Sequence, residues 1–146
     1  AVLEFLVASG EILLVTTPEP TSITDSYSLL KALYRHPRFT QETTKVKMIA
    51  NRVEKEEEGE VLFSKLNAVV TRYLKVPMTY LGCVPEDAHL SRAVMQQVPV
   101  SLQNPGARST AAYERIARRL LGREEEERQP KRGMAAFFSH IVTGKK

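Results

Sequence analysis

The amino-acid sequence predicts an α/β fold, in which a parallel β-sheet carries helices on both faces. Three short apolar segments with the character of buried strands alternate with segments whose apolar residues recur at helical spacing. Strands that alternate with helices pair in parallel through crossover connections, and these connections place helices on the faces of the sheet. The 146 residues, 42% of them hydrophobic, have the composition of a globular domain or of part of one.

The first strand and the first helix are separated by a proline-rich break. Residues 12–16 form a continuous apolar run, which is typical of a strand that is buried on both faces and therefore central in its sheet. After Pro18 and Pro20, the pair Ser22 and Asp25 has the spacing of a capping box. Apolar residues then recur at helical spacing as far as His36, where the helix is expected to end.

The same unit repeats twice, and a last helix follows. We expect strands over residues 46–50 and 78–84, each followed by a helix, and the helix after the first of them begins in an acidic turn. The last helix is expected over residues 107–121. Its inner side would carry Ala112, Ile116, Leu120, Ala117 and Leu121.

Three parallel strands leave an apolar sheet edge without a partner, so this architecture predicts further strands that the sequence does not contain. The chain begins with Ala1 and enters an apolar segment at once. We therefore interpret it as a fragment whose N-terminal part is missing. That part could include a Gly-rich phosphate loop, since neither GxxxxGK[ST] nor GxGxxG occurs in the sequence.

Polar residues follow each predicted strand at the end where open parallel sheets bind ligands. They are Thr16 to Glu19, Asn51 with Arg52, and Pro85 to Asp87. Carboxylate and amide groups from three loops on one rim could bind a nucleoside, because an amide both donates to and accepts from a base edge. The alternative is that each is an ordinary loop or helix cap. Asp87 would then cap the next helix, and Asp25 would stabilise a helix dipole without any partner.

These residues resemble a known family. The sequence is similar to the C-terminal half of MinD/ParA-type deviant Walker ATPases. The motifs that carry the similarity are LVTTPEPTSITDSY at residues 14–27, Asn51-Arg52, Gly82, residues 84–87, Ala93-Val94 and Pro99-Val100. Within that family the flagellar-number regulators, called FlhG, FleN or YlxH, are the most similar branch. The resemblance covers residues 1–121 and implies a P-loop NTPase fold for that part.

The resemblance also implies roles for single residues. Asn51 and Asp87 are similar to positions that bind adenine, Pro85 would contribute its backbone, and Arg52 would flank the base. Glu19 is similar to a carboxylate that reaches the ribose across an ATP-bound homodimer, and Asp25 to a carboxylate on the dimer and partner surface. The phosphate loop and the Walker B strand of the family match nothing in this chain. It is therefore expected to lack catalytic residues and not to hydrolyse ATP alone, although the complete protein would bind ATP with Mg.

The end of the chain differs from the rest in charge. Residues 128–146 carry five basic side chains and no acidic one, whereas the remaining residues hold 16 basic and 17 acidic side chains. Residues 122–133 are predicted to form a charged linker.

In residues 134–146, five apolar side chains recur at helical spacing between cations, which predicts an amphipathic helix lying on an anionic membrane. The predicted membrane-binding residues are Lys131, Arg132, Met134, Phe137, Phe138, Ile141, Val142, Lys145 and Lys146. The alternative is that this helix docks on the body as an ordinary last helix.

The resemblance implies that the chain is the C-terminal part of a MinD-like ATPase that regulates flagellar number and placement. It would act in the cytoplasm, peripherally on the inner face of the membrane, with flagellar assembly proteins such as the SRP-type GTPase FlhF as partners. The single cysteine, Cys83, favours a reducing compartment, and the three histidines have no metal-ligand spacing. Two alternatives remain: a non-hydrolysing partner-binding module, and a partitioning ATPase that binds DNA. The near-neutral body argues against nucleic acid.

Overall fold

The computed structural model describes residues 2–123, which form a parallel three-stranded sheet with helices on both faces, as predicted. The strands are β1 (Glu11–Thr16), β2 (Lys45–Val53) and β3 (Met78–Pro85), in the order β1-β2-β3. The helices are α1 (Val2–Ala8), α2 (Pro20–Arg35), α3 (Glu56–Tyr73), α4 (Ala88–Met95), α5 (Val100–Gln103) and α6 (Arg108–Leu120).

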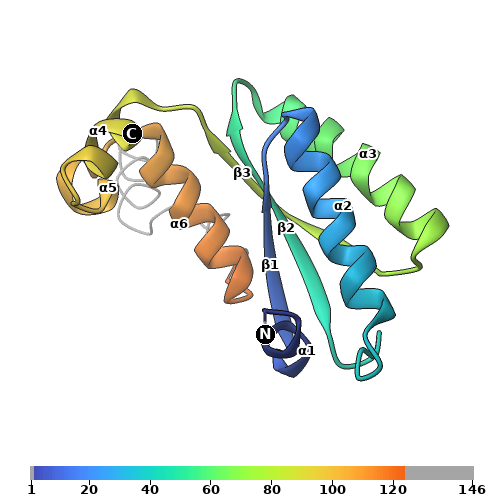
Figure 1. Ribbon diagram of the computed structural model, residues 1–146. Coiled ribbons are helices and arrows are strands. Elements are labelled where there is room, and N and C mark those ends of the chain that lie inside the picture. The colour runs from blue at the N-terminus through green and yellow to red at the C-terminus, as the bar shows by residue number, and fades with distance from the viewer. Residues whose placement is uncertain (1, 124–146) are drawn as a thin grey trace, which may run out of the picture.

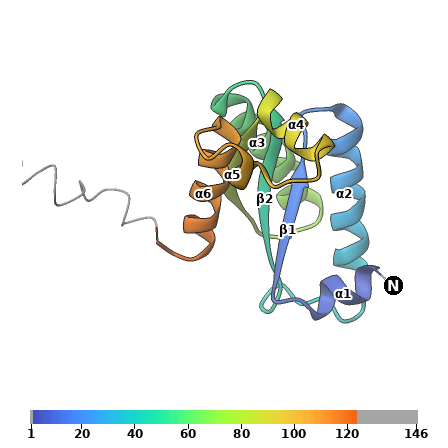
Figure 2. The same ribbon diagram turned by 90° about the vertical axis from the view of Figure 1, so that its left-hand side faces the viewer.

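The sheet is covered unevenly on its two faces. Helices α2 and α3 lie on one face, and α6 lies on the other (Figures 1 and 2). The main core forms between the sheet and the first pair of helices, where Leu30, Met48, Leu66 and Val70 are at most 2% exposed. A smaller core under α6 joins Leu81, Val84 and Ile116. Strand β3 is thereby packed on both faces.

The prediction that the first strand is central and buried on both faces is wrong for the described residues. Strand β1 lies at one edge of the three-stranded sheet, and its residues are alternately buried and exposed. Leu14 is 6% exposed under α2, whereas Leu13 and Val15 on the other face are 45% and 55% exposed. The reason is that α6, on that other face, packs on β3, which is the strand farthest from β1.

The start of α2 also differs from the prediction. The helix begins at Pro20 with Glu19 as its N-cap residue, and Ser22 does not form a capping box. The hydroxyl of Ser22 instead accepts a hydrogen bond from the backbone N–H of Thr17, at 3.0 Å. A proline fits the first helical position because its φ is already helical and its missing N–H would have no partner there.

The last described helix, α6, has nearly the predicted length but a narrower buried side. Ala112 and Ile116 are buried as predicted, whereas Ala117 is exposed and Leu121 is 66% exposed. The helix ends in a turn in which Gly122 has a φ of 69°. Within residues 2–123, no helix is both long and apolar enough to cross a membrane. Beyond Arg123, the predicted linker and the predicted helix over residues 134–146 lie outside the described residues.

Candidate functional site

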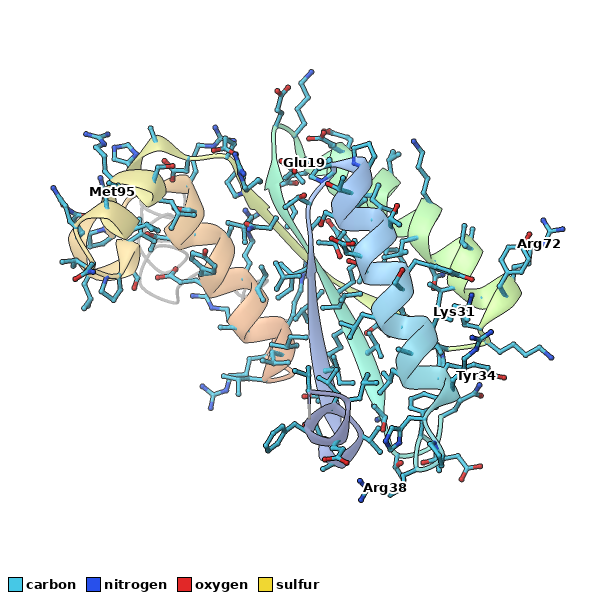
Figure 3. The ribbon with its side chains drawn as sticks, viewed as in Figure 1. Glu19, Lys31, Tyr34, Arg38, Arg72 and Met95 are labelled. Atoms are coloured by element: carbon cyan, nitrogen blue, oxygen red, sulfur yellow. The ribbon has the colours of Figure 1, made fainter. Side chains whose placement is uncertain are left out.

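The three loops that the sequence placed on one rim do meet in the structure. Arg52, near the end of β2, donates a hydrogen bond from Nε to Oε2 of Glu86, just after β3, at 3.0 Å. Its Nη1 lies 3.9 Å from Oε1 of Glu19, which follows β1. Figure 3 shows Glu19 at the start of α2, at this end of the sheet. One guanidinium therefore links the ends of all three strands.

The backbone of Arg52 has an unusual conformation for a residue with a side chain. Strand β2 continues past the predicted end at Asn51 as far as Val53, but its pairing with β3 shifts between these two residues. Arg52, at the shift, has a φ of 57°. The hydrogen bond that the guanidinium donates to Glu86 raises the pKa of Arg52, and the charges of Glu86 and Glu19 act in the same direction.

Asp87, a predicted adenine-binding residue, is engaged in contacts that hold the fold together. Its Oδ1 accepts a hydrogen bond from the backbone N–H of His89, which caps α4. Its Oδ2 accepts from the backbone N–H and from the hydroxyl of Ser109, at 3.0 and 2.8 Å. The side chain is 6% exposed. The bonds from Ser109, followed by that from His89, hold the pKa of Asp87 well below its usual range.

The role of helix cap, which the sequence left open for Asp87, is therefore present in the structure. Asp87 ties the start of α4 to the start of α6, and both of its carboxylate oxygens already accept hydrogen bonds. A base could reach only the remaining lone pairs of an almost fully buried side chain. Adenine binding by Asp87 stays a prediction.

Asn51 and Pro85 lie on neighbouring strands beside Arg52. Asn51 pairs with Val84 across the β2–β3 ladder, and Pro85 pairs with Val53. Asn51 is half-buried, and the structure assigns its side chain no hydrogen bond within residues 2–123. Its amide is therefore able to donate to and accept from a ligand, which is what the recognition of a base edge requires.

Glu19 and Asp25 share a second feature, an open hollow of about 470 Å³ along the first turns of α2. Asp25 is exposed on this helix, and the hollow extends to β1 at Leu14 and Val15. Neither Asn51 nor Asp87 lines it. The structure thus divides the predicted site residues between the rim around Arg52 and this hollow, which meet at Glu19.

Sequence reasoning assigned no role to Glu86 and Ser109. Glu86 was visible as a polar residue of the third loop, but its pairing with Arg52 depends on the conformation of β2. Ser109 lies 22 residues from Asp87, so no local pattern connects the two. Within residues 2–123, no group of three or more His, Cys, Asp or Glu side chains could hold a metal ion.

Comparison with known proteins places the chain among MinD-like proteins, although no protein-family model matches it. It is 36% identical over 120 residues to the antiactivator FleN of Pseudomonas aeruginosa, which covers 82% of this chain and 41% of FleN. It is 27% identical over 141 residues to the flagellum site-determining protein YlxH of Helicobacter pylori, covering 94% and 46%. Against the septum site-determining protein MinD of Helicobacter pylori, identity is 34% over 136 residues, covering 88% and 47%.

Two solved structures agree with these relatives. The chain superposes on MinD of Aquifex aeolicus with a TM-score of 0.54 at 25% identity, over 80% of this chain and 46% of that one. The Aquifex aeolicus MinC:MinD complex gives a TM-score of 0.54 at 26% identity, over 78% and 43%. The chain therefore belongs to the MinD/ParA-type family, as its motifs predicted. Within that family it is similar to FleN and YlxH, and it spans less than half the length of each of these relatives.

Proposed function

We propose that this chain supplies the nucleoside-binding part of a MinD-like ATPase that regulates flagellar number and placement. The observation that supports it best is the rim, where Arg52 links Glu19 and Glu86 next to the unengaged amide of Asn51. Open parallel sheets bind their ligands at this end. The similarity to FleN and YlxH supports the flagellar role.

The charges of the rim suit the base and the ribose of ATP better than its phosphates. Two carboxylates surround one guanidinium, so a phosphate placed here would meet a net negative charge. Asn51 would bind the adenine edge, with Arg52 and the backbone of Pro85 beside it, and Glu19 would accept from ribose hydroxyls. ATP with bound Mg would supply the phosphoryl-transfer chemistry in the complete protein. The sequence contains no phosphate-loop motif, so we expect this chain alone not to hydrolyse ATP.

Nucleotide titrations test the base-reading role. Asn51→Ala should weaken binding of ATP and of adenosine, because each hydrogen bond to a base edge contributes about 1 kcal/mol, or roughly fivefold in affinity. Asn67→Ala is the matched control, since Asn67 lies on α3 and hydrogen-bonds only locally to Thr71 among the described residues. Equal affinities of the Asn51→Ala and Asn67→Ala variants, or equal binding of ATP and GTP by the wild-type chain, would contradict the assignment.

The membrane is proposed as the second ligand. Apolar side chains in residues 134–146, among them Phe137 and Phe138, would enter the headgroup region, and Lys145 and Lys146 would bind anionic lipid. In a flotation assay, the full chain should float with anionic vesicles and not with neutral ones. A chain shortened to residues 1–133 should remain at the bottom of the gradient. If the shortened chain floats as well as the full chain, the membrane proposal is wrong.

The partners would be a second copy of the complete protein and flagellar assembly proteins such as FlhF. Asp25 lies exposed on α2 beside Glu19, where a dimer or partner surface would have access to both. The solved MinC:MinD complex shows that a structurally similar protein binds another protein. Cross-linking of the complete protein with and without ATP tests the dimer. The Asp25→Ala variant should fold like the wild type but capture less FlhF.

A further inference from the structure

We propose that Glu86 is a positioning residue of the rim: it holds Arg52 in place, whereas Glu19 is the partner that a bound ligand replaces. This inference rests on the proposed nucleoside-binding function. Both glutamates pair with Arg52, but only Glu86 accepts a hydrogen bond from it. The division follows from their distances, their backbone contacts and the conformation of β2.

Glu86 contacts the irregular part of β2 at two points. Its backbone N–H donates to the carbonyl oxygen of Val53 at 2.9 Å, and its carboxylate accepts from Nε of Arg52 at 3.0 Å. Arg52, between these contacts, has the left-handed φ of 57°, which is unfavourable for a residue with a side chain. Glu86 thus stabilises a backbone conformation that Arg52 would not adopt by itself. Because Asn51 directly precedes Arg52, the same conformation sets the place of the Asn51 amide.

Glu19 is held much less firmly. Its carboxylate lies 3.9 Å from Nη1 of Arg52, which is beyond hydrogen-bond distance, and its side chain is 64% exposed. It is the N-cap residue of α2 but makes no side-chain cap bond. Nε of Arg52 is already bound to Glu86, whereas Nη1 has only the weakly held carboxylate of Glu19 beside it, at 3.9 Å. A ligand acceptor, such as a base nitrogen or a sugar oxygen, can therefore bind Arg52 in place of Glu19 without disturbing Glu86.

The first test uses the full 146-residue chain without ligand. Glu86→Gln and Glu19→Gln make the same chemical change beside the same arginine. Glu56→Gln is the matched control, because Glu56 pairs with Arg115 at 3.0 Å away from the rim. In ¹⁵N-resolved NMR spectra, Glu86→Gln should shift the Nε–Hε signal of Arg52 and the side-chain amide signals of Asn51. Glu19→Gln should shift both signals less, because the charge of Glu19 acts on Arg52 without a hydrogen bond, and Glu56→Gln should leave both in place. Equal shifts from the two rim variants, or none from Glu86→Gln, overturn the proposal.

The second test measures adenosine affinity, together with the melting temperature of each variant. Glu86→Gln should weaken adenosine binding about two- to fivefold. This is the change in affinity expected when the contribution of one exposed ion pair is lost. Glu86→Ala should weaken it further, because the hydrogen-bond acceptor is lost as well. Both should melt within a few degrees of Glu56→Gln. A loss of affinity that merely follows a loss of melting temperature overturns the positioning role. If wild-type chain does not bind adenosine, the proposed function fails, while the NMR comparison still decides whether Glu86 positions Arg52 and Asn51.

Discussion

Replacing Asp87 by alanine should destabilise the fold more than most single changes. The side chain is 6% exposed and accepts hydrogen bonds from His89 and from both the N–H and the hydroxyl of Ser109. Loss of the cap on α4 costs about 1 kcal/mol. Ser109 is 0% exposed, and leaving its buried donors without an acceptor costs about 1–3 kcal/mol. We therefore expect the free energy of unfolding to fall by about 2–4 kcal/mol.

The effect should depend on pH in a defined direction. Hydrogen bonds hold the pKa of Asp87 in the folded chain below the ordinary value, which is about 3.9 in an unfolded chain. The stabilisation is therefore complete above that ordinary value and is lost as the pH falls below it, towards the pKa of the folded state. The difference in stability between wild type and Asp87→Ala should be constant near neutral pH and should narrow below about pH 4.

Urea unfolding at several pH values measures both effects. With a slope of about 2 kcal/mol per molar urea, the expected loss moves the unfolding midpoint by about 1–2 M. Asp25→Ala is the matched control, because Asp25 is the other aspartate of the sequence and is exposed on α2. A loss below about 1 kcal/mol, or a difference that does not change on acidification, would refute the structural role of Asp87. Because Asp87 variants are expected to be less stable, their ligand affinities should be compared with that of the wild type under conditions in which both are fully folded.

Further predictions concern packing, the backbone and the thiol. Gly59→Ala should destabilise by about 1–3 kcal/mol, because its Cβ would lie 3.0 Å from that of Cys83; Gly106→Ala, where a Cβ meets nothing within 4 Å, should change urea stability by less than 1 kcal/mol. Gln97→Gly should raise the melting temperature, because Gln97 has a φ of 57° at the end of α4, where glycine gains about 0.5–1 kcal/mol. Burial raises the pKa of Cys83, so alkylation at pH 8, followed by mass spectrometry, should be slower in the folded chain than in urea.

The alternation of strands and helices was readable from the sequence because its signals are local. Proline and glycine mark the ends of the apolar runs. The predicted third strand is one residue shorter than β3, and the predicted last helix extends one residue beyond α6 at each end. The meeting of three loops on one rim was also predictable, because the carboxyl ends of parallel strands lie at one edge. The contact of Glu19 with Arg52 at 3.9 Å agrees with that reasoning.

Two of the failures have a different physical origin, since they depend on partners far away in the sequence, whereas the third arises within α2 itself. An apolar run such as residues 12–16 does not show whether one or both faces of the strand are covered. In the structure one face is covered, and Leu13 and Val15 on the other face are exposed. Nothing local marks Arg52 for a positive φ, and its hydrogen-bond partner Glu86 lies 34 residues further along the chain. Pro20 overrode the capping-box pattern of Ser22 and Asp25 by starting α2 earlier.

Three consecutive residues after β3 therefore have separate tasks, and this division bears on how the rim would read a base. Pro85 closes the ladder with Val53, Glu86 pairs with Arg52, and Asp87 ties α4 to α6. Two of the carboxylates near the rim are thus already committed to the fold. The groups left for a ligand are the amide of Asn51, the Nη groups of Arg52 and the exposed Glu19. If a nucleoside binds here, base discrimination should follow Asn51, and substitution of Asp87 should act mainly through stability.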